Sequence, residues 1–213
     1  MAAKAKKARR NFSSFTLPEA LQELQLSELL RWEIQPQPFQ ASAFLDERLR
    51  RLERNFDLAF SESAKELLID AYCEEVIDRH PRLKIWKSAS LQSDELTGLV
   101  DYLVAPKMAY VTKPLLCVVE AKKDDFEKGL AQCLVEMKAC RLNNEQAGYH
   151  LDIYGIVSNG GVWQFYQLTV AGQVFETLPH SLSNMEQMLG VLNYVFTKCE
   201  ENLPAQFKLA QAS

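Results

Sequence analysis

Two apolar runs in the middle of the chain predict neighbouring β-strands. The first is Gly98–Ala105, in which Asp101 is the one charged residue, and the second is Pro114–Lys122, which ends in Glu120 and Lys122. Runs of Val, Leu and Tyr bounded by Gly, Pro and Lys are typical of strands that are covered on both faces. Side chains alternate along a strand, so Glu120 and Lys122 share a face, and Asp101 can face the same spot. Isolated buried charges are costly and are usually paired or bound to a metal.

The pattern on either side of these runs predicts alternating helices and strands. Ser61 is expected to cap a helix that ends before Pro81, and Arg82–Lys87 alternates as a strand does. Residues 126–144 form an amphipathic helix pattern after Asp124. Residues 151–157 and 162–168 flank an Asn-Gly pair, which is a strong hairpin signal. Further helices are expected after Thr16, from Ser42 to Arg54 and from Ser181 to about Asn202.

Length and composition indicate one domain with additions. A chain of 213 residues can bury a sizeable core, and no apolar run has the length of a membrane span. The five cysteines show no metal-ligand spacing, and most lie at apolar positions of predicted helices and strands. They are therefore interpreted as buried free thiols of a cytoplasmic protein.

The charge is unevenly distributed. Lys4, Lys6, Lys7, Arg9 and Arg10 precede the first acid, and without them the chain has 19 basic and 28 acidic side chains. Avid nonspecific binding of duplex nucleic acid normally needs a basic surface, so the acidic body disfavours that class. A local groove can still be positive, because six lysines surround the two central strands in the sequence, namely Lys84, Lys87, Lys107, Lys113, Lys122 and Lys123.

The motif Asp101…Glu120-Ala121-Lys122, placed after a hydrophobic strand, resembles that of the PD-(D/E)xK nuclease superfamily. This resemblance implies the restriction-endonuclease-like fold: an α/β core of a helix, three strands, a helix and two strands around a mixed sheet. The core would span residues 60–168. Residues 1–13 would be a disordered basic tail, 14–59 a helical extension, and 169–213 a C-terminal helical segment packed on the core.

The resemblance also implies the site. Asp101, Glu120 and the Ala121 carbonyl would bind Mg²⁺ or Mn²⁺, and Lys122 would orient or activate the attacking water. The preceding helix often adds a glutamate in this family. Glu66 is the preferred choice here, and Glu62 and Glu75 are the alternatives. It is equally possible that all three are solvated acids outside the site. Gln132 stands where some relatives have a supporting glutamine, although Glu136 replaces the tyrosine that one subgroup has four residues later.

The expected function is metal-dependent hydrolysis of nucleic acid, and DNA is the expected substrate. The protein could belong to a defence or DNA-processing system. A protein partner or homodimer remains open, and no membrane association is expected. The alternative is a non-catalytic domain of the same fold that binds protein or nucleic acid. In that case Lys122 would form a buried ion pair with Asp101 or Glu120 without metal. His80, His150 and His180 are scattered without ligand spacing, and no phosphate-binding glycine loop is present.

Overall fold

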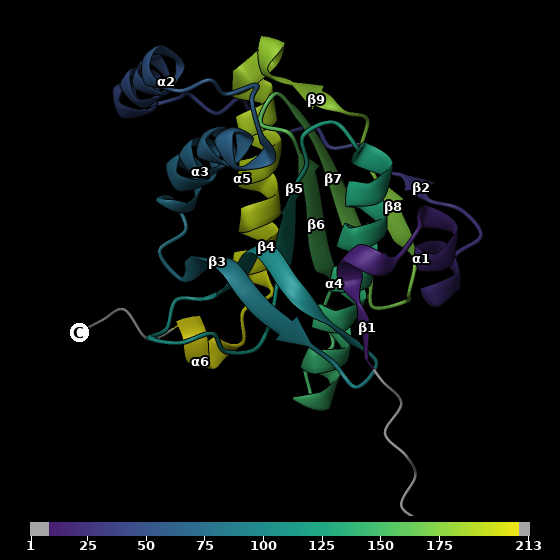
Figure 1. The fold of residues 1–213 in the computed structure, drawn as a ribbon. Helices are drawn as coiled ribbons and strands as arrows, with labels where there is room; N and C mark the ends of the chain where they lie inside the picture. Colours follow the sequence, from purple (N-terminus) through teal and green to yellow (C-terminus); the bar gives the residue numbers. More distant parts are fainter. Residues whose placement is uncertain (1–8, 209–213) are drawn as a thin grey trace, which may run out of the picture.

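A nine-stranded mixed sheet forms the centre of the protein, in a computed structural model that describes residues 9–208 (Figure 1). The strand order is β1-β4-β5-β6-β7-β8-β2, with β3 paired to β4 and β9 paired to β7. The five longest strands are β3 (Leu83–Gln92), β4 (Leu96–Pro106), β5 (Cys117–Ala121), β6 (Ile153–Ser158) and β7 (Val162–Leu168). β5 and β6 are parallel, whereas β3–β4, β4–β5 and β6–β7 are antiparallel. The predicted α/β class with a mixed sheet is confirmed.

Helices cover both faces of the sheet, and each face has its own apolar core. α3 (Glu62–Ile77) and α5 (Met185–Glu201) pack on one face, and α2 (Ala43–Asn55) packs on α3. α4 (Phe126–Gln146) and α1 (Leu17–Glu23) lie on the other face (Figure 1). α6 (Ala205–Lys208) follows α5. Along the chain, α3, β3, β4, β5, α4, β6 and β7 occur in the order that the sequence pattern predicts.

Helix starts follow the predicted caps. The Ser42 hydroxyl accepts the backbone N–H of Leu45, and the Ser61 hydroxyl accepts that of Ala64. The Thr16 backbone N–H donates to the carboxylate of Glu19 in the first turn of α1. These bonds satisfy N–H groups that the first helical turn leaves free. The amphipathic pattern after each cap then buries one side of the helix.

Four short strands depart from the predicted divisions of the chain. β1 (Arg10–Asn11) pairs with β4, so the predicted disordered tail of residues 1–13 is wrong at its C-terminal end; residues 1–8 lie outside the described residues. β2 (Leu30–Arg31) pairs with β8 (Val174–Glu176), and β9 (His180–Ser181) pairs with β7. The segments predicted as a helical extension, 14–59, and a C-terminal helical segment, 169–213, therefore also contribute strands to the sheet. All four strands are too short to carry a period-two pattern of their own.

Several boundaries also differ. β3 continues to Gln92 rather than ending at Lys87, because Ala89 and Leu91 alternate inward beyond the predicted end. β5 begins at Cys117 and ends at Ala121, which places Lys122 just after the strand. The five cysteines are buried and free, as predicted. None of the helices within residues 9–208 has the length and apolarity of a membrane span.

Candidate active site

Asp101 and Glu120 stand opposite each other where the pairing of β4 and β5 stops. Tyr102 pairs with Val119 in antiparallel register, so Asp101 and Glu120 are the next two residues of the ladder. They do not form a backbone pair. Instead, the Asp101 carboxylate accepts the backbone N–H of Ala121 at 2.8 Å, in place of a backbone carbonyl. The sheet thus opens at the two acids that the sequence predicted to converge.

The pairing of β4 with β3 is also interrupted at Asp101. Register is continuous from Leu83 to Gln92 except at Ser88, the residue that would face Asp101. Ser88 has a φ of 52°, in the left-handed region that non-glycine residues rarely adopt. Asp101 therefore lies between two interrupted ladders. Sparsely populated backbone conformations of this kind persist at functional sites, where the surrounding structure holds them in place.

Glu120 and Lys122 are in close contact inside the protein. The Lys122 ammonium lies 2.5 Å from Glu120 Oε1 and 3.9 Å from a carboxylate oxygen of Glu62. The Glu120 side chain is fully buried, and 12% of the Lys122 side chain is exposed. Glu120 Oε2 has no hydrogen-bond partner among the described residues. The site therefore contains a buried carboxylate oxygen whose bonding capacity is not used.

Burial and like charges make the ionised acids unfavourable. Burial first, and then the neighbouring charge of Asp101, raise the pKa of Glu120 to about 8, against the opposing effect of Lys122. Burial also raises the pKa of Asp101, which the Ala121 hydrogen bond and Lys122 oppose without cancelling. Burial lowers the pKa of Lys122, but the Glu120 carboxylate outweighs it, so the pKa of the ammonium is raised. Lys122 is therefore charged at neutral pH.

The three candidate glutamates of α3 have different surroundings. Glu62, at the helix start, is the one that contacts Lys122. Glu66 lies 2.9 Å from the ammonium of Lys87 but is close enough to raise the pKa of Asp101. Glu75 accepts hydrogen bonds from the backbone N–H and hydroxyl of Ser42, at the start of α2. Glu75 is thus a structural residue, whereas Glu62 and Glu66 both border the site.

Gln132 and Glu136 lie on the buried face of α4. Gln132 Nε2 donates to Glu136 Oε1 at 2.9 Å. Glu136 is fully buried, and its Oε2 has no hydrogen-bond partner among the described residues. Burial first, and then the charge of Glu120, hold the pKa of Glu136 well above its usual range. Gln132 therefore reaches the site through Glu136, a buried acid that the sequence pattern placed next to the apolar face without assigning it a role.

A glycine on α4 makes room for Lys122. A Cβ on Gly129 would lie 2.8 Å from Lys122 Cγ and 2.8 Å from Val157 Cγ1. Both contacts are shorter than side chains normally make, so any other residue would displace Lys122 or the helix. The close approach of α4 to β5 and β6 holds the Lys122 stem near Glu120.

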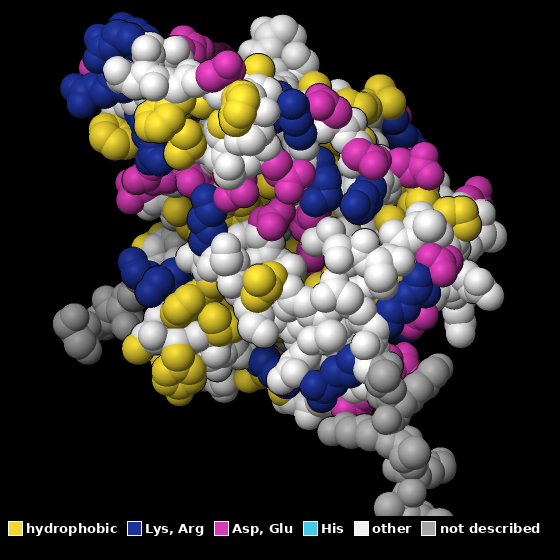
Figure 2. All heavy atoms as spheres, in the orientation of Figure 1, with side chains coloured by type: hydrophobic (Ala, Val, Ile, Leu, Met, Phe, Trp, Pro, Cys, Tyr) yellow, Lys and Arg dark blue, Asp and Glu magenta, His cyan; other side chains and the backbone are white. Residues whose placement is uncertain are grey.

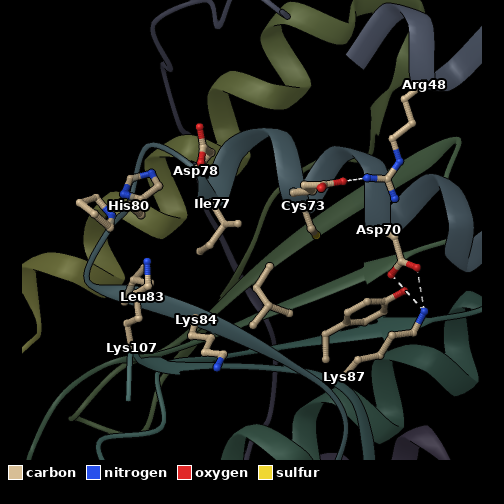
Figure 3. A pocket seen from close by; sticks show the side chains of 14 residues that line it. Arg48, Asp70, Cys73, Ile77, Asp78, His80, Leu83, Lys84, Lys87 and Lys107 are labelled. Atoms are coloured by element: carbon tan, nitrogen blue, oxygen red, sulfur yellow. Dashed lines mark hydrogen bonds and ion pairs between the residues drawn. The ribbon is translucent and has the colours of Figure 1, made fainter. Parts of the chain in front are cut away.

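The surface next to the site is acidic (Figure 2) and adjoins a cleft on the α3 side of the sheet. Acidic side chains gather between α3 and α4, with Lys and Arg on both sides (Figure 2). The cleft has a volume of about 600 Å³ between α2, α3 and β3 (Figure 3). Lys87 joins cleft and site, because its ammonium contacts both Glu66 and Asp70. Arg48 in the cleft is likewise paired with Glu74, so two of the cleft's cations are already neutralised.

The oxygen donors at this place are those that suit Mg²⁺ or Mn²⁺. Within residues 9–208, no group of three or more His, Cys, Asp and Glu side chains is arranged to hold a metal ion. Mg²⁺ keeps several waters, however, and is commonly held by one or two carboxylates. Asp101 and Glu120, with the unpartnered Glu120 Oε2, match that requirement, and the Ala121 carbonyl is the further oxygen at the strand end. The residues fit a hydrated divalent cation rather than an all-protein cage.

No protein-family model matches the sequence, and the search of curated proteins found no match either.

Proposed function

We propose that the protein is a metal-dependent nuclease with a restriction-endonuclease-like core. The observation that carries the proposal is the opening of the sheet at Asp101 and Glu120, with the Lys122 ammonium 2.5 Å from Glu120 and one buried oxygen of Glu120 unused. Phosphodiester hydrolysis needs charge neutralised on the phosphate and a water made nucleophilic, which a bound Mg²⁺ or Mn²⁺ supplies. The element order α3, β3, β4, β5, α4, β6, β7 supports the same fold.

The residues of the chain have distinct tasks in this proposal. Asp101 and Glu120 are the metal ligands, together with the Ala121 carbonyl, and Asp101 is oriented by its hydrogen bond from Ala121. Lys122 remains protonated beside Glu120 and stabilises negative charge that develops on the phosphate. Glu62, whose carboxylate lies 3.9 Å from the Lys122 ammonium, would help to hold Lys122 in place. Gln132 acts through Glu136 as a positioning residue, since its amide bonds to that buried carboxyl.

The alternative is a binding module of the same fold without catalysis. It is favoured by the close Lys122–Glu120 contact, because an ion pair needs no metal. Such a pair explains neither the partly buried charge of the second acid, Asp101, nor the free oxygen of Glu120. For that reason the nuclease is the preferred function.

Incubation of the purified protein with single- and double-stranded DNA and RNA, each with Mg²⁺, Mn²⁺ or EDTA, tests the proposal. We expect cleavage of at least one substrate with Mn²⁺ or Mg²⁺ and none in EDTA. Glu120→Gln should lose cleavage, whereas Glu28→Gln, the same change at an exposed position outside the site, should retain it. Absence of cleavage of every substrate at protein concentrations above those of the nucleic acid would favour the binding module.

A further inference from the structure

The segment between α2 and α3 carries two exposed phenylalanines. Phe56 is 53% exposed and Phe60 is 77% exposed, the largest value among the exposed large hydrophobic residues of the described chain. A single exposed apolar residue is ordinary on a protein surface. The position of Phe60 relative to the candidate active site is what makes it informative.

Phe60 is held at the rim of the site. The ammonium of Lys123 donates to the backbone carbonyl of Phe60 at 3.3 Å. Two residues further along, Glu62 lies 3.9 Å from the ammonium of Lys122. Ser61, between them, caps α3. The start of α3 is therefore tied to two consecutive lysines at the end of β5, and Phe60, whose side chain is exposed, takes part in this contact through its backbone carbonyl.

An unpaired cation, Lys123, lies at Phe60. Lys123 is exposed, and neither Lys123 nor Lys65, in the first turn of α3, forms an ion pair within residues 9–208. The cleft in Figure 3 is lined by four cations (Arg48, Lys84, Lys87 and Lys107) and three acids (Asp70, Glu74 and Asp78), but by no exposed aromatic side chain. A base can therefore stack at the Phe60 rim and not in the cleft.

We propose that the substrate is single-stranded nucleic acid and that an unpaired base next to the scissile phosphate stacks on Phe60, with the adjoining phosphate on Lys123. This inference rests on the proposed function, because the scissile phosphate is the one that lies at the proposed nuclease site. Exposed aromatic rings beside free cations are the usual means of binding single strands, because every base has a face that can stack. A duplex keeps these faces inside its own base stack and offers none to Phe60.

Binding in EDTA separates this inference from catalysis. Fluorescence anisotropy would compare a labelled oligothymidylate with a duplex of equal length, at low and constant salt, for the wild type, Phe60→Ala, Phe60→Trp and Leu178→Ala. Leu178 is the control, because it is 59% exposed and lies outside the α2–α3 segment. Phe60→Ala should weaken single-strand binding about 5- to 100-fold and leave duplex binding within about twofold. Phe60→Trp should bind as the wild type does, with its fluorescence quenched by the oligonucleotide.

The possible results separate the two proposals. Equal binding by Phe60→Ala and Leu178→Ala, an equal loss for duplex and single strand, or no single-strand binding by the wild type would each overturn the stacking site. Phe60-dependent binding without cleavage in Mn²⁺ would support the stacking site and refute the nuclease. Cleavage that is unchanged by Phe60→Ala would support the nuclease and refute the stacking site.

Discussion

Replacing Glu120 with glutamine distinguishes a metal ligand from a member of a structural ion pair. Glu120 is fully buried, and Lys122 is the one cation within residues 9–208 that contacts it. Burial and the charge of Asp101 nevertheless raise its pKa to about 8. Glutamine has nearly the same shape and is neutral at every pH, so the variant resembles the protonated form of the wild type.

The raised pKa sets both the sign and the size of the effect. The ordinary value is 4.5, so between pH 4.5 and about 8 the folded protein holds a proton that the unfolded chain has released. Wild-type stability therefore falls by about 1.4 kcal/mol per pH unit over that window, or about 3 kcal/mol by pH 7. The Glu120→Gln variant has no titratable group at this position and therefore does not lose this stability as the pH rises. In EDTA at pH 7 it should be about 3 kcal/mol more stable, which is about 6–12 °C in Tm for a chain of this size.

Denaturation of both proteins at several pH values, in EDTA and in excess Mn²⁺, measures these quantities. The difference between variant and wild type should grow from pH 4.5 to 8 and vanish below that range. Excess Mn²⁺ should stabilise the wild type by about 3 kcal/mol at one hundred times the dissociation constant, and the variant by much less. Glu28→Gln should behave as the wild type throughout.

The opposite sign would refute the reasoning. If Glu120 is ionised and serves only to pair with Lys122, then Glu120→Gln leaves a buried ammonium unpaired. The variant should then be less stable by about 3–5 kcal/mol. That result, together with a wild type that does not respond to Mn²⁺, would remove the metal site from the proposal.

Three further predictions concern the surroundings of the site. Lys122→Ala should reduce cleavage at least about 100-fold while Mn²⁺ still stabilises the protein; equal losses of metal binding and cleavage would contradict the role of Lys122. Ser88→Val should cost about 1–2 kcal/mol because a β-branched residue fits poorly at a φ of 52°, whereas Ser88→Gly should not destabilise and Ser90→Val serves as the control on the same strand. Gly129→Ala should lower the free energy of unfolding by about 1–3 kcal/mol and lower cleavage by displacing Lys122. Gly161→Ala is the control, because its new Cβ would have no neighbour closer than 3.6 Å. Unfolding titrations and initial cleavage rates check the Gly129 and Gly161 variants.

The convergence of Asp101 with Glu120 was predictable because both lie in long apolar strands with clear ends. Once two such strands pair as neighbours, their charged residues must meet at an edge or an opening of the sheet. The Asn-Gly hairpin and the Ser61 cap were predictable for a similar reason, since each is a local signal. The strands β1, β2, β8 and β9 were not. Leu30, for example, pairs with Phe175 far along the chain, and only the folded sheet brings them together.

The roles of the acids on α3 also depended on distant partners. Helical periodicity places Glu75 near the apolar stripe, and this made it a candidate for the site. In the structure its carboxylate binds Ser42, thirty-three residues earlier in the chain, at the start of α2. No local pattern contains that contact. Glu136 was equally hard to assign, because its burial follows from how closely α4 packs against the sheet rather than from residues near it in sequence.

The costs concentrated around Asp101 are themselves an argument for function. Two ladders are interrupted there, Ser88 is held at a positive φ, and burial disfavours the charges of Asp101, Glu120 and Glu136. A structural ion pair between Lys122 and Glu120 accounts for only one of these features, the buried charge of Glu120. It does not account for the second acid or for the unused oxygen of Glu120, and apolar residues of similar size would fill the same space at lower cost. The attraction of a divalent cation for the carboxylates would outweigh the repulsion between them and would lower the pKa of those that bind it. Asp101 and Glu120, which destabilise the metal-free fold, would then supply the binding energy for the cation.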